Sequence, residues 1–535
     1  MTTTIMASST GGGTAAARWM DLDSNRQTVL TRARTCANLT IPALLPPLGA
    51  TENDHLQTPY QSVGARAVNN LASKLMLTLY RPNSPYFKLV LDPMFAERLK
   101  QETGDESALS KAEAVFAKLE EGVMKYHEVK ADRVPLFNGL RHLIVTGNVL
   151  LFQDRLEEHK LRVFRLDQYV CRRNPSGRPM EIIVREYITS DEVPKAMRQL
   201  IGQDATEKPI ELYTYAKRNG NKWLVFQEIA GQVVPDSMGS YDEDAFPFLP
   251  LTWTLHPGEH YGRGHVEENL GDFISLEGLR KSFLEGAAAL AKLVFLVNPS
   301  GTTNKRAIEQ APNGGFAAGR AEDITTLQAD KMPDFQFVQS EIIRLEASLS
   351  RAFLMAESVQ RDAERVTAEE IRMMASDLDD TLGGIYTLLA QQLQAPLLIL
   401  RMAAMRAEKR LPPIPPNVQY SITTGFDALG RGHEVVKLQQ FLQLLAPFGE
   451  ETMRQMVGIG EYARRVAAGI GLDPSGLVPT DEELAQLTQQ AQMQAIIHQV
   501  TPIIAKALAD QGALQPPQGA LQPPQGAPQP PQDGA

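Results

Sequence analysis

Histidine and glutamate are concentrated in one short stretch, HPGEHYGRGH, at residues 256–265. Imidazole and carboxylate groups are ligands that zinc accepts. Four residues are therefore candidates for a metal site: His256, Glu259, His260 and His265. A helix would bring His256 and His260 together, but Pro257 and Gly258 interrupt it. We therefore interpret the stretch as a turn that leads into a long helix, and we expect no metal here.

Paired acids and nucleotide-binding loops are the other chemical signals that the sequence could carry. Asp379–Asp380 and Glu369–Glu370 are adjacent pairs, and neighbours on a helix point in different directions, so neither pair converges on one site. The phosphate-binding pattern G-x-x-x-x-G-K-[ST] does not occur, and neither does G-x-S-x-G or H-E-x-x-H. The sequence therefore predicts a structural protein without enzymatic activity or cofactor.

The most regular segment runs from Arg365 to Tyr386 and continues beyond it. Thr367 and Glu370 form a capping box that predicts the start of a helix. Apolar residues then recur at helical spacing: Ile371, Met374, Leu378, Leu382, Ile385 and Leu389. We expect Pro396 to end this helix, and we expect Gly383 and Gly384 to weaken it.

Composition limits the class of protein. A chain of 535 residues with 43% hydrophobic and 22% charged residues is globular and long enough for several domains. Two cysteines, Cys36 and Cys171, form no disulfide framework, which indicates a reduced, intracellular site of assembly. The net charge of −10 argues against tight static binding of DNA.

No membrane insertion is predicted. The N-terminus lacks the cationic start and apolar core of a signal peptide. The most apolar segment, Gly286–Val297, is too short to span a bilayer and contains Lys292.

The first half of the chain divides into helices and then strands. We expect residues 1–20 to be disordered and the following helices to cover Asp21–Asn38, Ser62–Tyr80, Ser110–Glu128 and Leu136–Val145. Apolar and polar residues then alternate, which predicts a mainly antiparallel sheet over residues 149–234 with a hairpin at Asn219-Gly220.

The second half is mainly helical. A helix over His265–Leu296 and another over Glu341–Leu354 flank a loop-rich insertion, and Thr480 with Glu483 opens a late helix. A Gln/Pro-rich heptapeptide repeat covers Gly512–Gln532, and we predict that it is disordered; a ligand for a polyproline-binding partner is the alternative. The fold class is therefore α+β, mainly α.

Six separated blocks, in this order along the chain, resemble the portal (head-to-tail connector) proteins of short-tailed, autographivirus-like podophages. The resemblance covers roughly Arg26 to Pro479. The blocks are QTPYQSVGARAVNNLASKLMLTL (57–79), TGNVLL (146–151), YGRGHVEENLGD (261–272), LVNPSG (296–301), GRAEDI (319–324) and TTGFDALGRG (423–432).

The resemblance implies a ring, usually of twelve subunits, at one capsid vertex, through which double-stranded DNA is packaged and ejected. It implies a portal-type fold with a wing over residues 21–264, stem helices over 265–294 and 340–358, and a clip over 295–339. It further implies a tunnel loop over 359–366, a long helix returning to the wing over 367–429, and a crown over 430–510. The tail, 511–535, lies outside the resemblance.

The implied partners are terminase, scaffolding and major capsid proteins, a tail adaptor and internal core proteins, in a virion assembled in the host cytoplasm. Candidate channel residues that touch DNA without reading its sequence are Gln360, Arg361, Asp362 and Arg365. Candidate clip residues that dock partners are Lys305 and Arg306. The stem residues expected to pair between neighbouring subunits are Glu277, Arg280, Lys281, Glu285, Glu341, Arg344, Glu346 and Arg351.

Two alternatives stay open at this point. A tail adaptor or other virion ring protein is expected to be smaller and to lack the bracketed insertion. A packaging ATPase would need the missing phosphate loop.

Overall fold

The computed structural model describes most of residues 13–290, with gaps at 52, 81–84, 93, 96, 99–106, 156, 195–196 and 198–208. It also describes 294–298, 323–327, 332–355, 384–412 and 418–422, and isolated residues or short runs up to 466. The chain divides into Met1–Ala428 and Leu429–Ala535. In the second unit the described residues are a helical run at 440–445 and isolated residues up to 466, and the rest of the predicted crown and the whole tail lie outside them.

Two short helices begin the described chain, α2 (Ala15–Ser24) and α3 (Gln27–Asn38). The Thr14 side chain caps α2 by accepting from the amide of Ala17, and Trp19 is 1% exposed because it packs edge-on against Tyr213. The prediction of disorder up to residue 20 was therefore wrong for the last six residues. The predicted helix over Asp21–Asn38 is interrupted near Asn25 and Arg26.

Three longer helices follow at the predicted places: α4 (Val63–Leu79), α6 (Ser107–Val129) and α7 (Arg133–Thr146). The apolar stripe of α4 is fully buried, as shown by Ala67, Leu71 and Leu75 at 0% exposure. A short turn, η1 (Pro42–Leu44), joins α3 to the segment before α4. Together these helices supply much of the main hydrophobic core.

The larger sheet is antiparallel and has the strand order β4-β5-β6-β7-β8, with β9 also paired to β7. Its strands are β4 (Tyr169–Arg173), β5 (Pro179–Ile188), β6 (Ile210–Asn219), β7 (Lys222–Ile229), β8 (Gln232–Val233) and β9 (Gly239–Asp242). Asn219 pairs with Lys222, so Gly220 is the first residue of a two-residue hairpin loop, and its φ is +62°. The predicted hairpin is present.

A second antiparallel sheet has the order β10-β2-β3, from β2 (Asn148–Asp154), β3 (Lys160–Phe164) and β10 (Phe248–Thr252). A further antiparallel pair joins β1 (Phe87–Leu91) to β13 (Val418–Ile422). The last described strand of this unit thus pairs with the first. Strands therefore continue to Thr252, beyond the predicted limit of 234. The predicted α+β class, with helices and antiparallel sheets, is confirmed.

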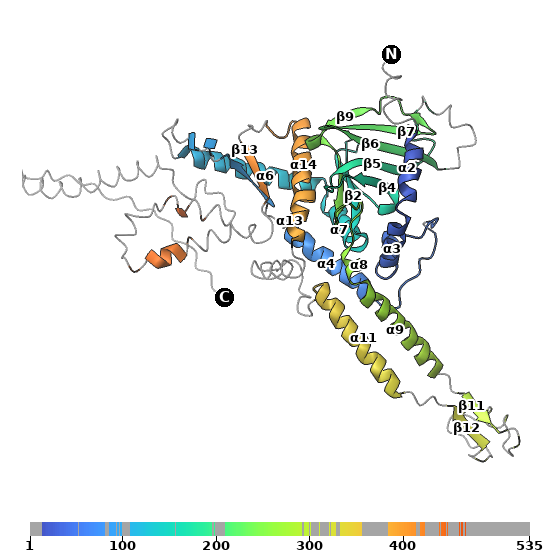
Figure 1. The fold of residues 1–535 in the computed structure, drawn as a ribbon. Helices are drawn as coiled ribbons and strands as arrows, with labels where there is room; N and C mark the ends of the chain where they lie inside the picture. The colour runs from blue at the N-terminus through green and yellow to red at the C-terminus, as the bar shows by residue number, and fades with distance from the viewer. Residues whose placement is uncertain are drawn as a thin grey trace, which may run out of the picture. The chain divides into compact units, whose positions relative to one another are not determined.

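Two helices then lie side by side, as Figure 1 shows: α9 (Leu270–Leu290), after the short α8 (His265–Glu268), and α11 (Met332–Ala352). Between them in sequence lie β11 (Val294–Val297) and β12 (Ile324–Leu327), which pair antiparallel. Helix α11 begins at Met332, inside the stretch that was assigned to the clip (295–339). The helix predicted over Glu341–Leu354 therefore begins nine residues earlier, with Pro333 in its first turn, where proline is well tolerated.

The last long helical segment differs from the prediction. Its described part begins at Ile385, after Gly384 with φ +58°, so the helix does not run through that glycine. It continues from α13 (Ile385–Leu389) through a π-helical turn (Ala390–Gln394) into α14 (Ala395–Ala407). Pro396 is thus not a stop, since it lies at the start of α14, where its missing N–H is tolerated.

Among the described residues, one helical segment, Thr387–Ala407, has the length and apolar character of a membrane span. More than half of it is buried within the chain. Arg401, inside it, is fully buried and makes a two-pronged ion pair with Asp132, while the Nδ1 of His127 lies 2.7 Å from the same carboxylate. These contacts are those of a core helix.

Candidate connector arm and its base

We call α9, α11, β11 and β12 the arm. The two helices are antiparallel and in close contact. Ser348 donates to Asp272 at 3.1 Å near one end, and Phe283 packs edge-on against Phe335, with centroids 5.5 Å apart, near the other. A Cβ on Gly286 would lie 2.8 Å from the Phe335 ring, so the absence of a side chain at Gly286 permits this approach.

The charged residues of the arm engage mainly within the chain. Arg280 forms an ion pair with Glu346 across the two helices, and Arg344 binds Glu341 on its own helix. Each of these four residues therefore has a partner within the chain, and their pairing between subunits stays a prediction.

The remaining candidates of that set have different surroundings. Glu277 accepts from the backbone amides of Tyr60 at 2.8 Å and Gln61 at 3.3 Å, so it ties the segment before α4 to α9. Lys281, Glu285 and Arg351 are exposed, and Arg351 donates from Nε to the carbonyl of Ala347. For Glu277, Lys281, Glu285 and Arg351 the intersubunit role stays a prediction.

The C-terminus of α11 is capped by side chains from two other helices. Leu354 ends the helix with a left-handed φ of +55°, and the amide of Met355 donates back to the carbonyl of Ser350 at 2.7 Å. The last carbonyls of a helix have no partner within the helix. The Asn70 amide donates to the carbonyls of Phe353 and Leu354, both at 3.0 Å, and the Lys74 ammonium donates to Leu354 at 2.6 Å. The dipole of α11 also favours a cation at the C-terminus of the helix.

His265 holds the same end from α8. Its Nε2 lies 3.0 Å from the carbonyl oxygen of Ala352, and its Nδ1 lies 2.9 Å from Glu268. The ring also contacts Phe353, with centroids 4.7 Å apart. This histidine, a candidate metal ligand in the sequence, is a structural link between α8 and α11.

Three glycines allow backbones to meet at the base of the arm. A Cβ on Gly264 would lie 2.7 Å from the Ile144 carbonyl oxygen, and one on Gly147 would lie 2.4 Å from the Arg263 backbone. Gly147 also has φ +73°, which an L side chain rarely adopts. The side-chain amide of Asn148 donates to the carbonyl of Gly262 and accepts from the backbone amide of Gly262, both at 2.8 Å. The TGNVLL and YGRGHVEENLGD blocks are therefore adjacent in space.

At the other end of the arm, the LVNPSG and GRAEDI blocks meet. Val297 pairs with Ile324, and the Asn298 amide donates to the Asp323 carbonyl at 2.9 Å. Five of the six resembling blocks thus contribute to the arm or to its base. The sixth, 423–432, lies outside the described residues.

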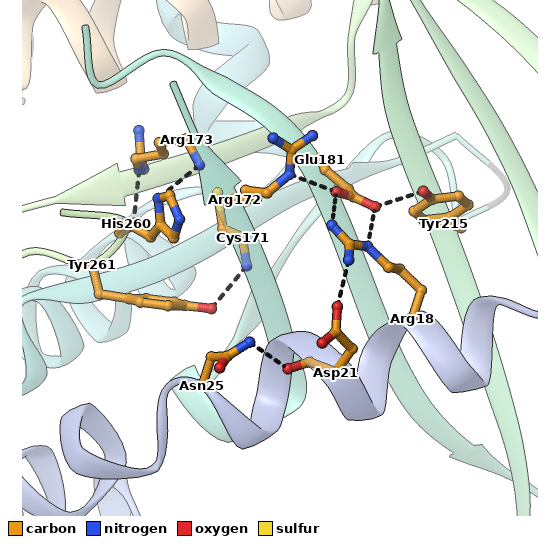
Figure 2. A network of polar contacts seen from close by, with 10 residues as sticks. All are labelled: Arg18, Asp21, Asn25, Cys171, Arg172, Arg173, Glu181, Tyr215, His260 and Tyr261. Atoms are coloured by element: carbon orange, nitrogen blue, oxygen red, sulfur yellow. Dashed lines mark hydrogen bonds and ion pairs between the residues drawn. The ribbon is translucent and has the colours of Figure 1, made fainter. Parts of the chain in front are cut away.

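Polar contacts join α2 to the larger sheet, and separate contacts join the same sheet to the 256–265 loop (Figure 2). Glu181 receives hydrogen bonds from Arg18, Arg172 and Tyr215. Burial by itself would raise the pKa of Glu181, but these three donors outweigh it and lower the pKa to about 2. The network fixes α2 on the sheet.

The histidine-rich loop forms the other part of Figure 2. The amide of Arg173 donates to Nδ1 of His260 at 3.3 Å, and the Tyr261 hydroxyl accepts from the amide of Cys171 at 3.0 Å. Burial, together with Arg172 and Arg173, lowers the pKa of His260. Among the described residues no three candidate ligands come together to hold a metal. The predicted turn is present, and helix α8 follows it at His265.

The DNA and docking candidates cannot be placed in the same way. Gln360, Arg361, Asp362, Arg365 and Lys305 lie outside the described residues, and Arg306 is described as one exposed helical residue. Sequence reasoning missed Asn70, Lys74 and Asn148. All three lie inside resembling blocks, so the blocks themselves were the signal that pointed to them.

Comparison with known proteins gives one consistent result. The family described as "Bacteriophage head to tail connecting protein" matches residues 12–478. The portal protein of Escherichia phage T7 is 35% identical over 505 residues, covering 92% of this chain and 94% of the relative. That of Enterobacteria phage T3 is 36% identical over 485 residues, covering 89% and 90%. The solved neck of an empty GTA particle is 14% identical with a TM-score of 0.34, covering 71% of this chain and 86% of that one.

The family match and the relatives place this chain in one class of protein, the connectors between a phage head and its tail. The chain belongs to the family of bacteriophage head to tail connecting proteins, and the relatives that cover nearly all of it are portal proteins. The portal function that the resemblance implied is confirmed by these relatives, and the assignment does not rest on the distant structural match.

Proposed function

We propose that this portal protein forms a closed ring of twelve copies at one capsid vertex and that the ring encloses the channel for packaging and ejection of double-stranded DNA. The observation that carries the proposal is the family match over residues 12–478. The ring docks terminase during packaging and a tail adaptor afterwards. Scaffolding, major capsid and internal core proteins are its other partners in a virion assembled in the host cytoplasm.

The parts of the ring follow the order of the chain. We assign the wing to residues 21–264, the stem to α9 and α11, and the clip to the segment between them, which includes β11 and β12. Residues 359–366 form the tunnel loop, 367–429 the return to the wing, and 430–510 the crown. The close contact of α9 and α11 and the capped end of α11 support a rigid stem.

Arg361 and Arg365 are the residues that we propose to contact DNA, with Gln360 and Asp362 beside them. Repeated around a ring, each arginine becomes a circle of positive charge that holds phosphates without reading bases. The net charge of the chain is −10, so the contact with phosphates is confined to this loop. Because few phosphates are bound, the DNA can slide. Lys305 and Arg306 serve in partner docking.

The alternatives have less support. If the chain were a tail adaptor, its similarity to portal proteins would be unexplained, because that similarity covers 89–92% of the chain. A packaging ATPase lacks support in the sequence, since the phosphate-binding loop does not occur.

Packaging by assembled particles tests the proposal. Procapsids that contain the protein are expected to package DNA when terminase and ATP are supplied, and procapsids assembled without it are not. An antibody against the chain should label one vertex. Labelling of all vertices, or packaging without the protein, would refute the proposed role, and ATP hydrolysis by the purified chain would favour the enzyme.

A further inference from the structure

Side chains from two other helices hold the C-terminal end of α11. Three successive carbonyl groups, at residues 352–354, each face a side-chain nitrogen from outside the arm. Asn70 and Lys74 reach them from α4, and His265 reaches them from α8. These contacts join residues that lie 87 to 284 positions apart in the sequence. The end of α11 is therefore fixed to the rest of the chain and not only to its partner helix α9.

Leu354 adopts a strained backbone conformation at this end. Its φ is +55°, in the left-handed region where a helix end usually has glycine. Strain of this kind persists where the surrounding structure holds it, and it concentrates at functional sites. Here Asn70 and Lys74 donate to the Leu354 carbonyl at 3.0 and 2.6 Å. Phe353 is fully buried and packs edge-on against Phe273 of α9, with centroids 5.6 Å apart. Helices α4 and α9 thus set the direction in which the chain leaves α11.

This fixed turn lies close to the loop that we propose to contact DNA. The described chain ends at Met355, four residues before the proposed tunnel loop over 359–366. Four residues span at most about 14 Å, so the turn restricts where the loop begins. We infer that Asn70 and Lys74 are positioning residues for the DNA contact, because they hold the start of the loop in place from α4. The inference rests on the proposed function, which supplies the loop and its contact with DNA.

A direct contact between Lys74 and a phosphate is the competing explanation, because Lys74 is a cation. Asn70 separates the two explanations. Its side chain is neutral, and its amide donates to the backbone carbonyls of Phe353 and Leu354. Asn69, the preceding residue of the same helix, has an exposed side chain. Removing the amide at position 70 therefore changes the hold on α11 without changing charge, and position 69 provides the control.

Retention of DNA by filled heads tests the inference. Procapsids that carry Asn70→Ala or Lys74→Met are filled by terminase and ATP, and the DNA that resists nuclease is measured. For both variants we expect normal rings by native mass spectrometry but several-fold less protected DNA. Lys74→Arg keeps a cationic donor and should restore retention. Asn69→Ala is the matched control and should retain DNA normally.

A helix cap removed elsewhere separates positioning from general stability. Thr14→Ala deletes the side-chain cap of α2, in which Thr14 accepts from the amide of Ala17 at 3.1 Å, and it should leave retention unchanged. Equal losses from Thr14→Ala and Asn70→Ala would overturn the inference, and so would the absence of rings from both α4 variants.

The remaining outcomes also decide between the explanations. Normal retention by Asn70→Ala, with a loss from Lys74→Met alone, would indicate a direct phosphate contact and overturn the inference. Normal retention by both variants, or no recovery with Lys74→Arg, would overturn it too. In each of these cases the proposed function stands, because unmodified procapsids still protect DNA. If unmodified procapsids protect none, the proposed function fails as well.

Discussion

Gly147 and Gly264 meet backbone to backbone at the base of the arm, so closely that a Cβ on Gly264 would lie 2.8 Å from the amide nitrogen of Gly147. Backbone atoms cannot rotate away as a side-chain end can. The contact joins the end of α7 to the start of α8, and α8 leads into the arm.

Gly147→Ala should therefore destabilise the protein strongly. It combines a left-handed φ of +73° with a Cβ 2.4 Å from the Arg263 backbone, and strain of this kind costs about 1–3 kcal/mol before any clash is added. Urea unfolding followed by circular dichroism measures the loss. The control Gly122→Ala, with open space and an ordinary φ, should be neutral or gain up to about 1 kcal/mol. Equal stability of the two variants would contradict the close contact.

Acid should weaken the attachment of α2 through Glu181. The pKa of this carboxyl is lowered to about 2 in the fold from an ordinary value of 4.5. Its contribution, roughly 3 kcal/mol, is therefore complete above pH 4.5 and is lost as the pH falls toward 2. Between those limits the stability of the unmodified protein should fall more steeply than that of Glu181→Gln. Parallel curves for the two proteins would show that the network in Figure 2 does not stabilise the ionised carboxylate.

The cap on α11 should depend on Lys74. Lys74→Met keeps the aliphatic part but removes the charged hydrogen bond to Leu354, with an expected loss of about 1–2 kcal/mol. Hydrogen exchange should rise at the last turn of α11 and in the two residues after it, 349–354, and much less at α14. Lys118→Met, at an exposed position on α6, provides the comparison and should leave exchange in α11 unchanged.

Much of the fold could be predicted from sequence because apolar periodicity reports burial directly. Helices α4, α6 and α7, the antiparallel strands and the hairpin at Gly220 follow from such patterns. The start of α2 was missed because Thr/Ser/Gly/Ala-rich composition suggests disorder, whereas one tryptophan, Trp19, is buried against a sheet residue almost 200 positions away. The helix through Pro396 was missed because a π-helical turn precedes it.

The site was harder to predict, for a physical reason. Arg280 and Glu346 form an ion pair within one chain, and nothing in the sequence around either residue indicates this partner. Likewise, Asn70 and Lys74 carry no local sign that they cap a helix some 280 residues later. Long-range contacts of this kind have no periodic signature.

Removing the proposed channel arginines should affect DNA but not assembly. In Arg361→Ala/Arg365→Ala rings are expected to form normally, because these residues are assigned to the DNA contact, while retention of packaged DNA or packaging yield should change several-fold. The control Arg178→Ala/Lys222→Ala removes two exposed cations, one from the turn between β4 and β5 and one from β7, and should package normally. Unchanged packaging and retention in the first variant would refute the assignment.

Electron microscopy of the purified full-length chain tests the central claim most directly. Assembly through head-to-tail contacts predicts flanged rings with a central hole, of one dominant subunit number near twelve. A protein that stays monomeric at all concentrations and ionic strengths tried, or that forms compact particles without a hole, would contradict the account.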